Sequence, residues 1–242
     1  MSALYDDIGR GYARLRRPDP RIARPLHAAL GPARTVLNIG AGTGNYEPLD
    51  RDLIAIEPSE EMIRQRPPGS APVVRAEASA LPFADKAFEA SLAVLTVHHW
   101  PDPAAGLAEM RRVTSGPIVL MTFDPAARPW LTDYLPGLIT LDEGQMPALS
   151  DYAAVLGPVR IEPLLAPHDC LDGFLYAYWR RPEAYLDPAV RKGSSAFRAL
   201  PDLEPGLARL AADLESGAWD RRFGALRGLE VYDAGYRLVI AG

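Results

Sequence analysis

The most constraining feature of the sequence is an apolar run that ends in three glycines at alternate positions. Residues 36–46 read VLNIGAGTGNY, with Gly40, Gly42 and Gly44 directly after the run. Glycines at a strand end let backbone N–H groups approach a ligand closely, because no Cβ intervenes. A second apolar run, LIAIE, ends in Glu57, and an acid there can accept both hydroxyls of a ribose. Together these features indicate that the chain binds a nucleoside.

The glycine spacing differs from the dinucleotide-binding fingerprint. That fingerprint is G-x-G-x-x-G, with a pyrophosphate on the N-terminus of the following helix. Here the spacing is G-x-G-x-G, and Asn45, Tyr46, Glu47 and Pro48 follow. Pro48 leaves little room for a long phosphate-binding helix, and the carboxylate of Glu47 would repel a pyrophosphate. The pattern favours a ligand that carries an amino acid and no phosphate, although three glycines alone also fit a structural turn.

The rest of the chain has the pattern of an α/β fold. Five apolar runs, TVLNI, LIAIE, PVVRA, ASLAVLTV and PIVLMTF, alternate with helical or turn segments. Such runs suit strands buried on both faces, and alternating βα units predict a doubly wound sheet with its ligand at the carboxyl ends of the strands. Asp19-Pro20, Ser59 and Asp102-Pro103 are predicted to begin helices. Two amphipathic helices are expected at 4–15 and near 204–217.

Several motifs occur in one order and at consistent separations. VLNIGAGTG, AIEPSEEM and AEASALPFADKAFEASLAVLTVHHWPD resemble the successive motifs of class I S-adenosylmethionine (SAM)-dependent methyltransferases, in the small-molecule group related to the ubiquinone-biosynthesis and trans-aconitate enzymes. The resemblance covers residues 1–125 and, more loosely, the final strand. It departs at Asn38, where the family has an acid, so no charge is expected there to hold the methionine ammonium group.

The resemblance implies a Rossmann-like, doubly wound, mainly parallel seven-stranded sheet with an antiparallel last strand and a helical lid, in one domain over residues 1–242. Insertions longer than the connections require usually form lids in enzymes. The expected parts are N-terminal capping helices (1–31), a SAM-binding core (32–124), lid insertions (125–157 and 168–230) and closing strands (159–167 and 231–242).

The resemblance also implies which residues contact SAM. Glu57 would bind the ribose hydroxyls, Glu77 the adenine amino group, and Arg16 the methionine carboxylate. An N-terminal salt bridge or a helix-cap role remains the alternative for Glu57, and plain core packing remains the alternative for Tyr12 and Met62. The full expected set is Tyr12, Arg16, Asn38, Gly40, Ala41, Gly42, Gly44, Glu57, Pro58, Met62, Glu77, Ala78 and Thr96.

The candidates for catalysis follow the fourth apolar run. His98 or His99 could take a proton from the acceptor, because the pKa of an imidazole lies near neutrality; closing the strand by packing is the competing role for either histidine. Tyr5 is a third candidate, on the N-terminal helix that the family folds over SAM. The expected acceptor-binding residues are Trp100, Trp130 and Tyr134, joined by one or two of the aromatic residues in the segment FLYAYW.

Composition excludes several other classes. The net charge of −5 over 242 residues argues against a nucleic-acid surface, and HHWP stands where nucleic-acid methyltransferases carry an N/D-P-P-Y/F tetrapeptide. The four histidines lack metal-ligand spacing, and the single cysteine, Cys170, excludes an internal disulfide. No apolar run approaches the ~20 residues of a membrane span. A soluble, cytoplasmic monomer or homodimer without a metal is expected.

The sequence therefore predicts methyl transfer from SAM to an oxygen, nitrogen or carbon atom of a small organic molecule, with secondary metabolites among the candidates, and S-adenosylhomocysteine (SAH) as the second product. Two alternatives remain open at this point. One is an enzyme that uses SAM without net methylation, such as a cyclase or a pericyclic catalyst. The other is a non-catalytic protein that senses SAM.

Overall fold

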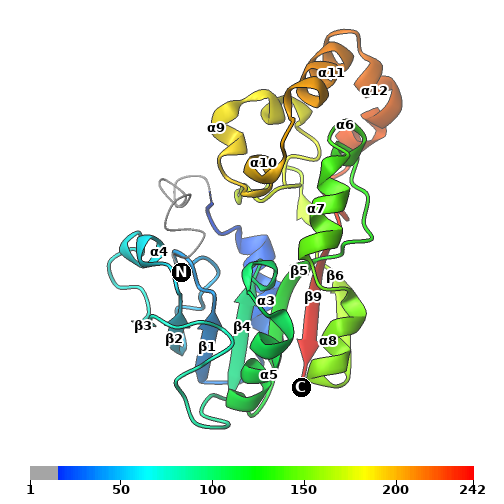
Figure 1. Cartoon of the computed structure of the whole chain (residues 1–242). Helices are drawn as coiled ribbons and strands as arrows, with labels where there is room; N and C mark the ends of the chain where they lie inside the picture. Colours follow the sequence, from blue (N-terminus) through cyan, green and yellow to red (C-terminus); the bar gives the residue numbers. More distant parts are fainter. Residues whose placement is uncertain (1–15) are drawn as a thin grey trace.

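The computed structural model describes residues 16–242, and its centre is a seven-stranded sheet (Figure 1). The strand order is β3-β2-β1-β4-β5-β9-β6. Neighbouring strands are parallel except at β9, which runs antiparallel to both β5 and β6. The predicted fold class is confirmed. The strands are β1 (Thr35–Ile39), β2 (Asp52–Ile56), β3 (Val73–Val74), β4 (Ala90–Val94), β5 (Ile118–Phe123), β6 (Val159–Pro163) and β9 (Tyr236–Ala241).

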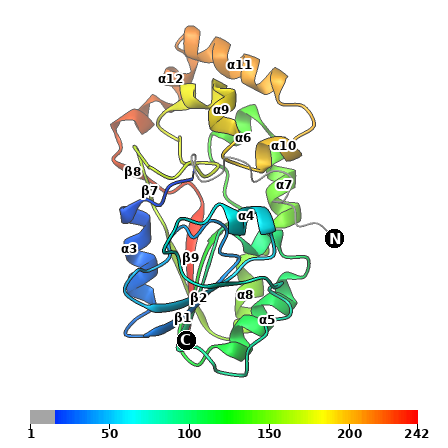
Figure 2. The same cartoon turned by 90° about the vertical axis from the view of Figure 1, so that its left-hand side faces the viewer.

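Both faces of the sheet are covered, because successive side chains of a strand point to opposite faces. Along β5, Val119 and Met121 pack in the cluster that contains α3 (Pro20–Ala29), whereas Ile118 and Leu120 pack with α5 (Pro103–Val113) and α8 (Leu149–Leu156). Figure 2 shows α3 on one side of the sheet and α5 and α8 on the other. All six residues of β5 are buried, which explains its uninterrupted apolar sequence.

The predicted helix starts are confirmed by their caps. The side chain of Asp19 accepts from the backbone N–H of Arg21 at 2.9 Å. Ser59 caps α4 (Glu60–Arg64) in the same way, and Asp102 caps α5. These side chains satisfy N–H groups that the helices leave without an internal partner.

A helical cap stands at the carboxyl ends of the strands (Figure 1). We use this name for α6, α7 and residues 168–230. The stretch 125–157 divides between two locations, because α6 and α7 belong to the cap whereas α8 lies beside α5 on the sheet. The cap helices are α6 (Leu131–Tyr134), α7 (Gly137–Gln145), η2 (Pro182–Leu186), α9 (Pro188–Arg191), α10 (Ala196–Ala199), α11 (Glu204–Glu215), α12 (Ala218–Phe223) and η3 (Gly224–Gly228).

The antiparallel last strand that the sequence predicts is β9. β9 lies between β5 and β6, and the two-residue strands β7 (Ala166–Pro167) and β8 (Val231–Tyr232) pair in a separate small sheet. Within residues 16–242, no helix combines the length and the apolar character that crossing a membrane requires.

Candidate functional site

A cavity of about 270 Å³ opens where β1, β2, β3 and β4 end. We call it the first cavity. It lies at the edge where a doubly wound sheet binds ligands, because the carboxyl ends of parallel strands meet there. Most residues that the sequence predicts for the cofactor line it: Arg16, Asn38, Gly40, Ala41, Gly42, Glu57, Pro58, Met62, Glu77, Ala78 and Thr96.

Gly40 and Gly42 line the first cavity, and both have the left-handed backbone conformation that favours glycine. Gly40 has φ +66°, and a Cβ there would lie 2.0 Å from Oγ1 of Thr96. Gly42 has φ +55°, with Cε of Met62 3.3 Å from the position of a Cβ. The loop after β1 can therefore approach the end of β4 only with glycine at position 40.

Glu57 is buried at the end of β2 and faces this loop. One carboxylate oxygen accepts from the N–H of Gly42 at 2.7 Å, and the other accepts from the N–H of Ser59 at 2.9 Å. The second bond lies at the start of α4, so the helix-cap alternative for Glu57 is present in the structure, and ribose binding stays a prediction. A carboxylate has about four acceptor positions, so these bonds and bonds to hydroxyl groups are compatible.

Asn38 connects the first cavity to a buried ion pair. Its amide donates to Glu47 at 3.1 Å, and Glu47 is paired with Arg66 at 2.9 Å, with both charged side chains almost fully buried. The negative charge that Asn38 lacks is thus present nearby on Glu47, although Arg66 balances it. Gly44 lies against this pair and is absent from the described lining of the first cavity.

Thr43 supplies an unsatisfied polar atom to the first cavity. Its side chain is 4% exposed, and Oγ1 has no hydrogen-bond partner within residues 16–242. A buried hydroxyl without a partner is costly, so this atom is positioned for a ligand that can hydrogen-bond to it. The glycine loop, Glu57 and this hydroxyl together fit a nucleoside with a polar amino-acid tail.

Two residues other than glycine hold left-handed backbone conformations at the cavity wall. Tyr46 has φ 64° and Leu95 has φ 49°, and both line the first cavity. Leu95 directly follows β4, which ends at Val94, three residues before the end of the apolar run ASLAVLTV. Strained residues of this kind cluster at functional sites, where the surrounding structure holds them in place.

Arg16 lies at the boundary between the sheet and the cap. Its guanidinium binds Asp172 through Nε at 2.5 Å and Nη2 at 3.1 Å. The hydroxyl of Tyr46 donates to the same carboxylate at 2.8 Å. Two of the N–H donors of Arg16 therefore serve Asp172, and the contact of Arg16 with a methionine carboxylate stays a prediction.

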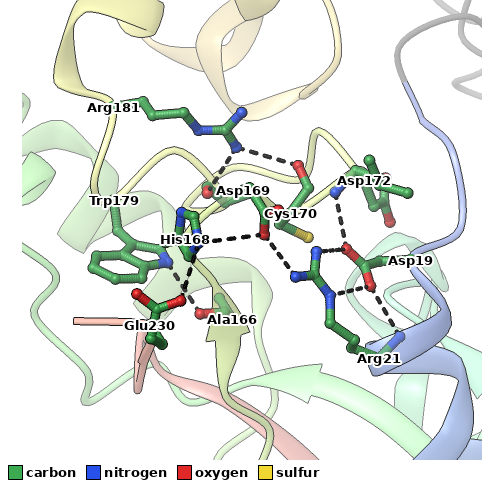
Figure 3. Close-up of polar contacts among 12 residues, drawn as sticks. Asp19, Arg21, Ala166, His168, Asp169, Cys170, Asp172, Trp179, Arg181 and Glu230 are labelled. Carbon is green, nitrogen blue, oxygen red and sulfur yellow. Dashed lines mark hydrogen bonds and ion pairs between the residues drawn. The ribbon is translucent and has the colours of Figure 1, made fainter. Parts of the chain in front are cut away.

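A second group of contacts joins the same boundary (Figure 3). Asp19 accepts from the N–H of Leu171 at 3.0 Å, and Arg21 pairs with both Asp19 and Asp169. Arg21, as the main cause, lowers the pKa of Asp19 to about 2. These contacts join the start of α3 to the loop that carries Asp172. Cys170 in that loop is buried, which raises its pKa to about 12 and keeps the thiol protonated.

His98 and His99 lie in a short 3₁₀ helix, η1 (Val97–His99), directly after β4. Their ring centroids are 3.9 Å apart, so the rings are adjacent. Burial, aided by the nearby charge of Arg16, lowers the pKa of His99 to about 4. Burial also lowers the pKa of His98 well below its usual value. The expectation of a histidine that titrates near neutrality is wrong, because both imidazoles are neutral there.

A second cavity of about 60 Å³ lies between the end of the sheet and the cap. It shares Arg16, Leu95 and His99 with the first cavity, and His98 lines the second cavity. The rest of its described lining comes from β5, α7, the loop 174–176, residues 194–196 and β9. The added residues are Phe123, Leu141, Asp142, Gln145, Met146, Phe174, Leu175, Tyr176, Ser194, Ser195, Ala196 and Tyr236.

The three residues predicted to bind the acceptor do not line one common cavity. Trp100 lines the first cavity and also packs on Gly106 of α5. Trp130 and Tyr134 are buried inside the cap and belong to neither cavity lining described for residues 16–242. The indole N–H of Trp130 donates to the carbonyl of Trp179 at 2.8 Å, as expected of a core residue. Tyr5 and Tyr12 lie outside the described residues.

Comparison with known proteins agrees with this geometry. A family model described as a methyltransferase domain matches residues 37–116. A solved structure from Anabaena variabilis, described as a methyltransferase from an antibiotic biosynthesis pathway, is 35% identical, with a TM-score of 0.87 over 95% of this chain and 100% of that one. The chain belongs to the class I SAM-dependent methyltransferases.

One more sequence relative and one solved structure of similar fold extend the comparison. The demethylmenaquinone methyltransferase of Renibacterium salmoninarum is 34% identical over 154 residues, which cover 55% of this chain and 63% of that protein. Geranyl diphosphate C-methyltransferase from Streptomyces coelicolor, solved with magnesium, geranyl diphosphate and SAH, is 16% identical, with a TM-score of 0.51 over 90% of this chain and 74% of that one. The second likeness shows the fold alone. Within residues 16–242 of this methyltransferase, no three His, Cys, Asp or Glu side chains gather as a metal site would require.

Sequence reasoning missed several residues of the methyltransferase site. Thr43 and Tyr46 lie inside the glycine motif VLNIGAGTGNY. Their position directly after the first strand could have indicated that they line the cavity. Leu95 and Asp172 had no such signal. A leucine in the left-handed conformation follows no sequence pattern, and Asp172 pairs with Arg16 across 156 positions, which no local pattern can show.

Proposed function

We propose that the protein transfers the methyl group of SAM to an oxygen, nitrogen or carbon atom of a small organic molecule. SAM would occupy the first cavity, and the acceptor would reach the methyl group from the second. The observation that carries this proposal is the glycine loop facing Glu57, beside the unsatisfied hydroxyl of Thr43. The neighbour from an antibiotic biosynthesis pathway supports a secondary metabolite as the acceptor.

Bound SAM supplies an electrophilic methyl carbon on a sulfonium, and the chain would contribute positioning. Glu57 would orient the ribose, and the glycine loop would hold the amino-acid part near Asn38 and Thr43. Burial of His98 and His99 keeps both imidazoles neutral, which is the form that accepts a proton, but the same burial makes each a weaker base than an exposed histidine. Correct positioning and exclusion of water supply about 7–11 kcal/mol in such reactions.

The first test of the proposal is ligand choice. We expect SAM and SAH to bind in calorimetry and NAD to leave no signal, because the glycine loop leads into no long phosphate-binding helix. A screen of small acceptors that follows SAH release then separates methyl transfer from SAM sensing and from catalysis without methylation. Tight NAD binding without SAM binding would overturn the proposal.

A substitution at Glu57 tests the position of the ribose. We expect Glu57→Gln to weaken SAH binding by roughly 10- to 100-fold, because charge-assisted hydrogen bonds to the hydroxyls are replaced by weaker ones. Glu60→Gln is the matched control, since Glu60 is exposed in the first turn of α4. Thermal unfolding without ligand must accompany the titration, because Glu57 also holds the N–H groups of Gly42 and Ser59. Unchanged affinity in a folded Glu57→Gln protein would remove Glu57 from the ribose site.

A further inference from the structure

The second cavity contains a buried carboxylate whose bonding is incomplete. Asp142 of α7 is 5% exposed and lines this cavity. One of its oxygens, Oδ2, accepts from the hydroxyl of Tyr176 at 2.8 Å. The other oxygen has no hydrogen bond within residues 16–242, and it is not one of the fully buried unpaired atoms of that part of the chain, so it is accessible at the cavity wall. An accessible carboxylate oxygen without a protein partner is available to a ligand that donates a hydrogen bond to it.

Four aromatic rings line the same cavity as this carboxylate. Phe123 stacks on Tyr176 with ring centroids 5.0 Å apart, and Phe174 meets Tyr236 edge-on at 4.5 Å. The backbone N–H of Tyr176 donates to the hydroxyl of Tyr236 at 3.2 Å, which fixes the two tyrosines relative to each other. All four rings line the second cavity. Aromatic faces beside a carboxylate favour a cation, because the ring quadrupole adds to the charge attraction.

Among residues 16–242, the basic groups near this carboxylate are engaged or uncharged. Arg16 lines the same cavity, but Asp172 binds it through two hydrogen bonds. Arg128 pairs with Glu143 on the outer side of α7. His98 and His99 have lowered pKa values and carry no charge near neutral pH. Burial raises the pKa of Asp142 to about 6, so it is ionised above that pH.

We infer that the second cavity is an acceptor subsite for a small cationic amino group, which Asp142 binds and Tyr176 positions. This inference rests on the proposed function and identifies the chemical class of its acceptor. A cavity of about 60 Å³ accommodates an amino head group with little attached carbon, so the body of the acceptor extends towards His99 and the first cavity. A neutral hydroxyl group would leave the charge of Asp142 uncompensated.

The experiment measures the preference of the protein for amines over isosteric alcohols. With SAH bound, ligand-observed NMR would compare propylamine with propanol and benzylamine with benzyl alcohol at pH 7.5. We expect at least one amine to bind about 10-fold or more tightly than its alcohol, the difference that a charge-assisted hydrogen bond supplies.

Two variants and a control then assign the preference to Asp142. Asp142→Asn should abolish the preference for the amine, because the amide still accepts from Tyr176 but carries no charge. Tyr176→Phe should weaken amine binding and leave a residual preference. Glu143→Gln, the neighbouring acid on α7, should leave the preference unchanged. Thermal unfolding of each variant would show that it is folded.

The outcomes separate this inference from the proposed function. If SAH binds and the alcohols bind as well as the amines, or no amine binds at all, the subsite assignment is overturned while methyl transfer stands. A full amine preference in folded Asp142→Asn also overturns it. If SAH itself does not bind, the proposed function fails first, which calorimetry on the same protein reveals.

Discussion

The two cavities are adjacent but are constructed by different means. Apart from Arg16, the first is formed by residues of one region, 38–101, at the ends of neighbouring strands. The second is formed by residues from seven separate parts of the chain, from Arg16 to Tyr236. A site made from strand ends is fixed by the topology of the sheet, whereas a site between sheet and cap depends on how the cap packs.

The polar groups of the two cavities differ in the same way. In the first, backbone N–H groups hold Glu57, and its position follows from the loop after β1. In the second, another side chain holds Asp142. We therefore expect the donor site to be the more constant part of this methyltransferase and the second cavity to be the part in which specificity can change by substitution.

The largest expected effect is on stability, and it tests whether Trp130 is a core residue of the cap. Trp130 is 4% exposed and contacts Tyr185 and Trp219 edge-on, with centroids 5.6 and 5.2 Å away. Trp130→Ala should lower the free energy of unfolding by about 3–5 kcal/mol, measured by denaturant titration, because it leaves a large cavity. A stable Trp130→Ala protein with only a raised acceptor KM would restore the sequence-based prediction that Trp130 walls the acceptor site.

This contrast explains how much the sequence could predict. The strands and the helix starts at Asp19, Ser59 and Asp102 follow from local patterns, and so does most of the first cavity. The second cavity joins residues as distant as Phe123 and Tyr236, which no spacing rule relates. The aromatic residues of the cap look alike in sequence, so nothing local distinguishes Trp130, which packs in the core, from ring residues that reach the cavity.

The next prediction tests the close contact between Gly40 and Thr96 at the first cavity. Gly40→Ala should destabilise the protein by about 1–3 kcal/mol and weaken SAH binding, because the new Cβ overlaps the side chain of Thr96. Gly31→Ala is the control: its φ is +60°, similar to that of Gly40, but no heavy atom lies within 4 Å of the added Cβ. It should cost only the backbone strain and leave SAH affinity unchanged. Equal losses of SAH affinity in both variants would contradict a specific role for the contact with Thr96.

Asp142 provides a stability test of the second cavity. The folded pKa of about 6 lies above the ordinary value of 3.8, so the folded protein binds more protons between these values, and its stability falls as pH rises through that window. Asp142→Asn should therefore raise the free energy of unfolding above pH 6 by up to roughly 3 kcal/mol, at about 1.4 kcal/mol for each pKa unit. The gain should shrink towards pH 4, as chemical denaturation across pH would show. A variant less stable than the parent at pH 7.5 would mean that the charge of Asp142 is already compensated in the folded chain.

The smallest expected effect concerns the histidines where the two cavities meet. A neutral imidazole is the form that accepts a proton, and the pKa of His99 lies at about 4 because burial and Arg16 disfavour the charged form. Activity that depends on this base should persist as pH falls from 7.5 and decline only on approach to that value. Comparing pH profiles of kcat/KM for the parent and His99→Asn isolates the contribution of His99 from that of Asp142, which titrates nearer pH 6. The ratio of the two profiles should stay flat between pH 6 and 7.5. An ionisation near pH 6.5 that disappears in His99→Asn would show that water reaches the ring when ligands bind, and that the boundary between the cavities opens during the reaction.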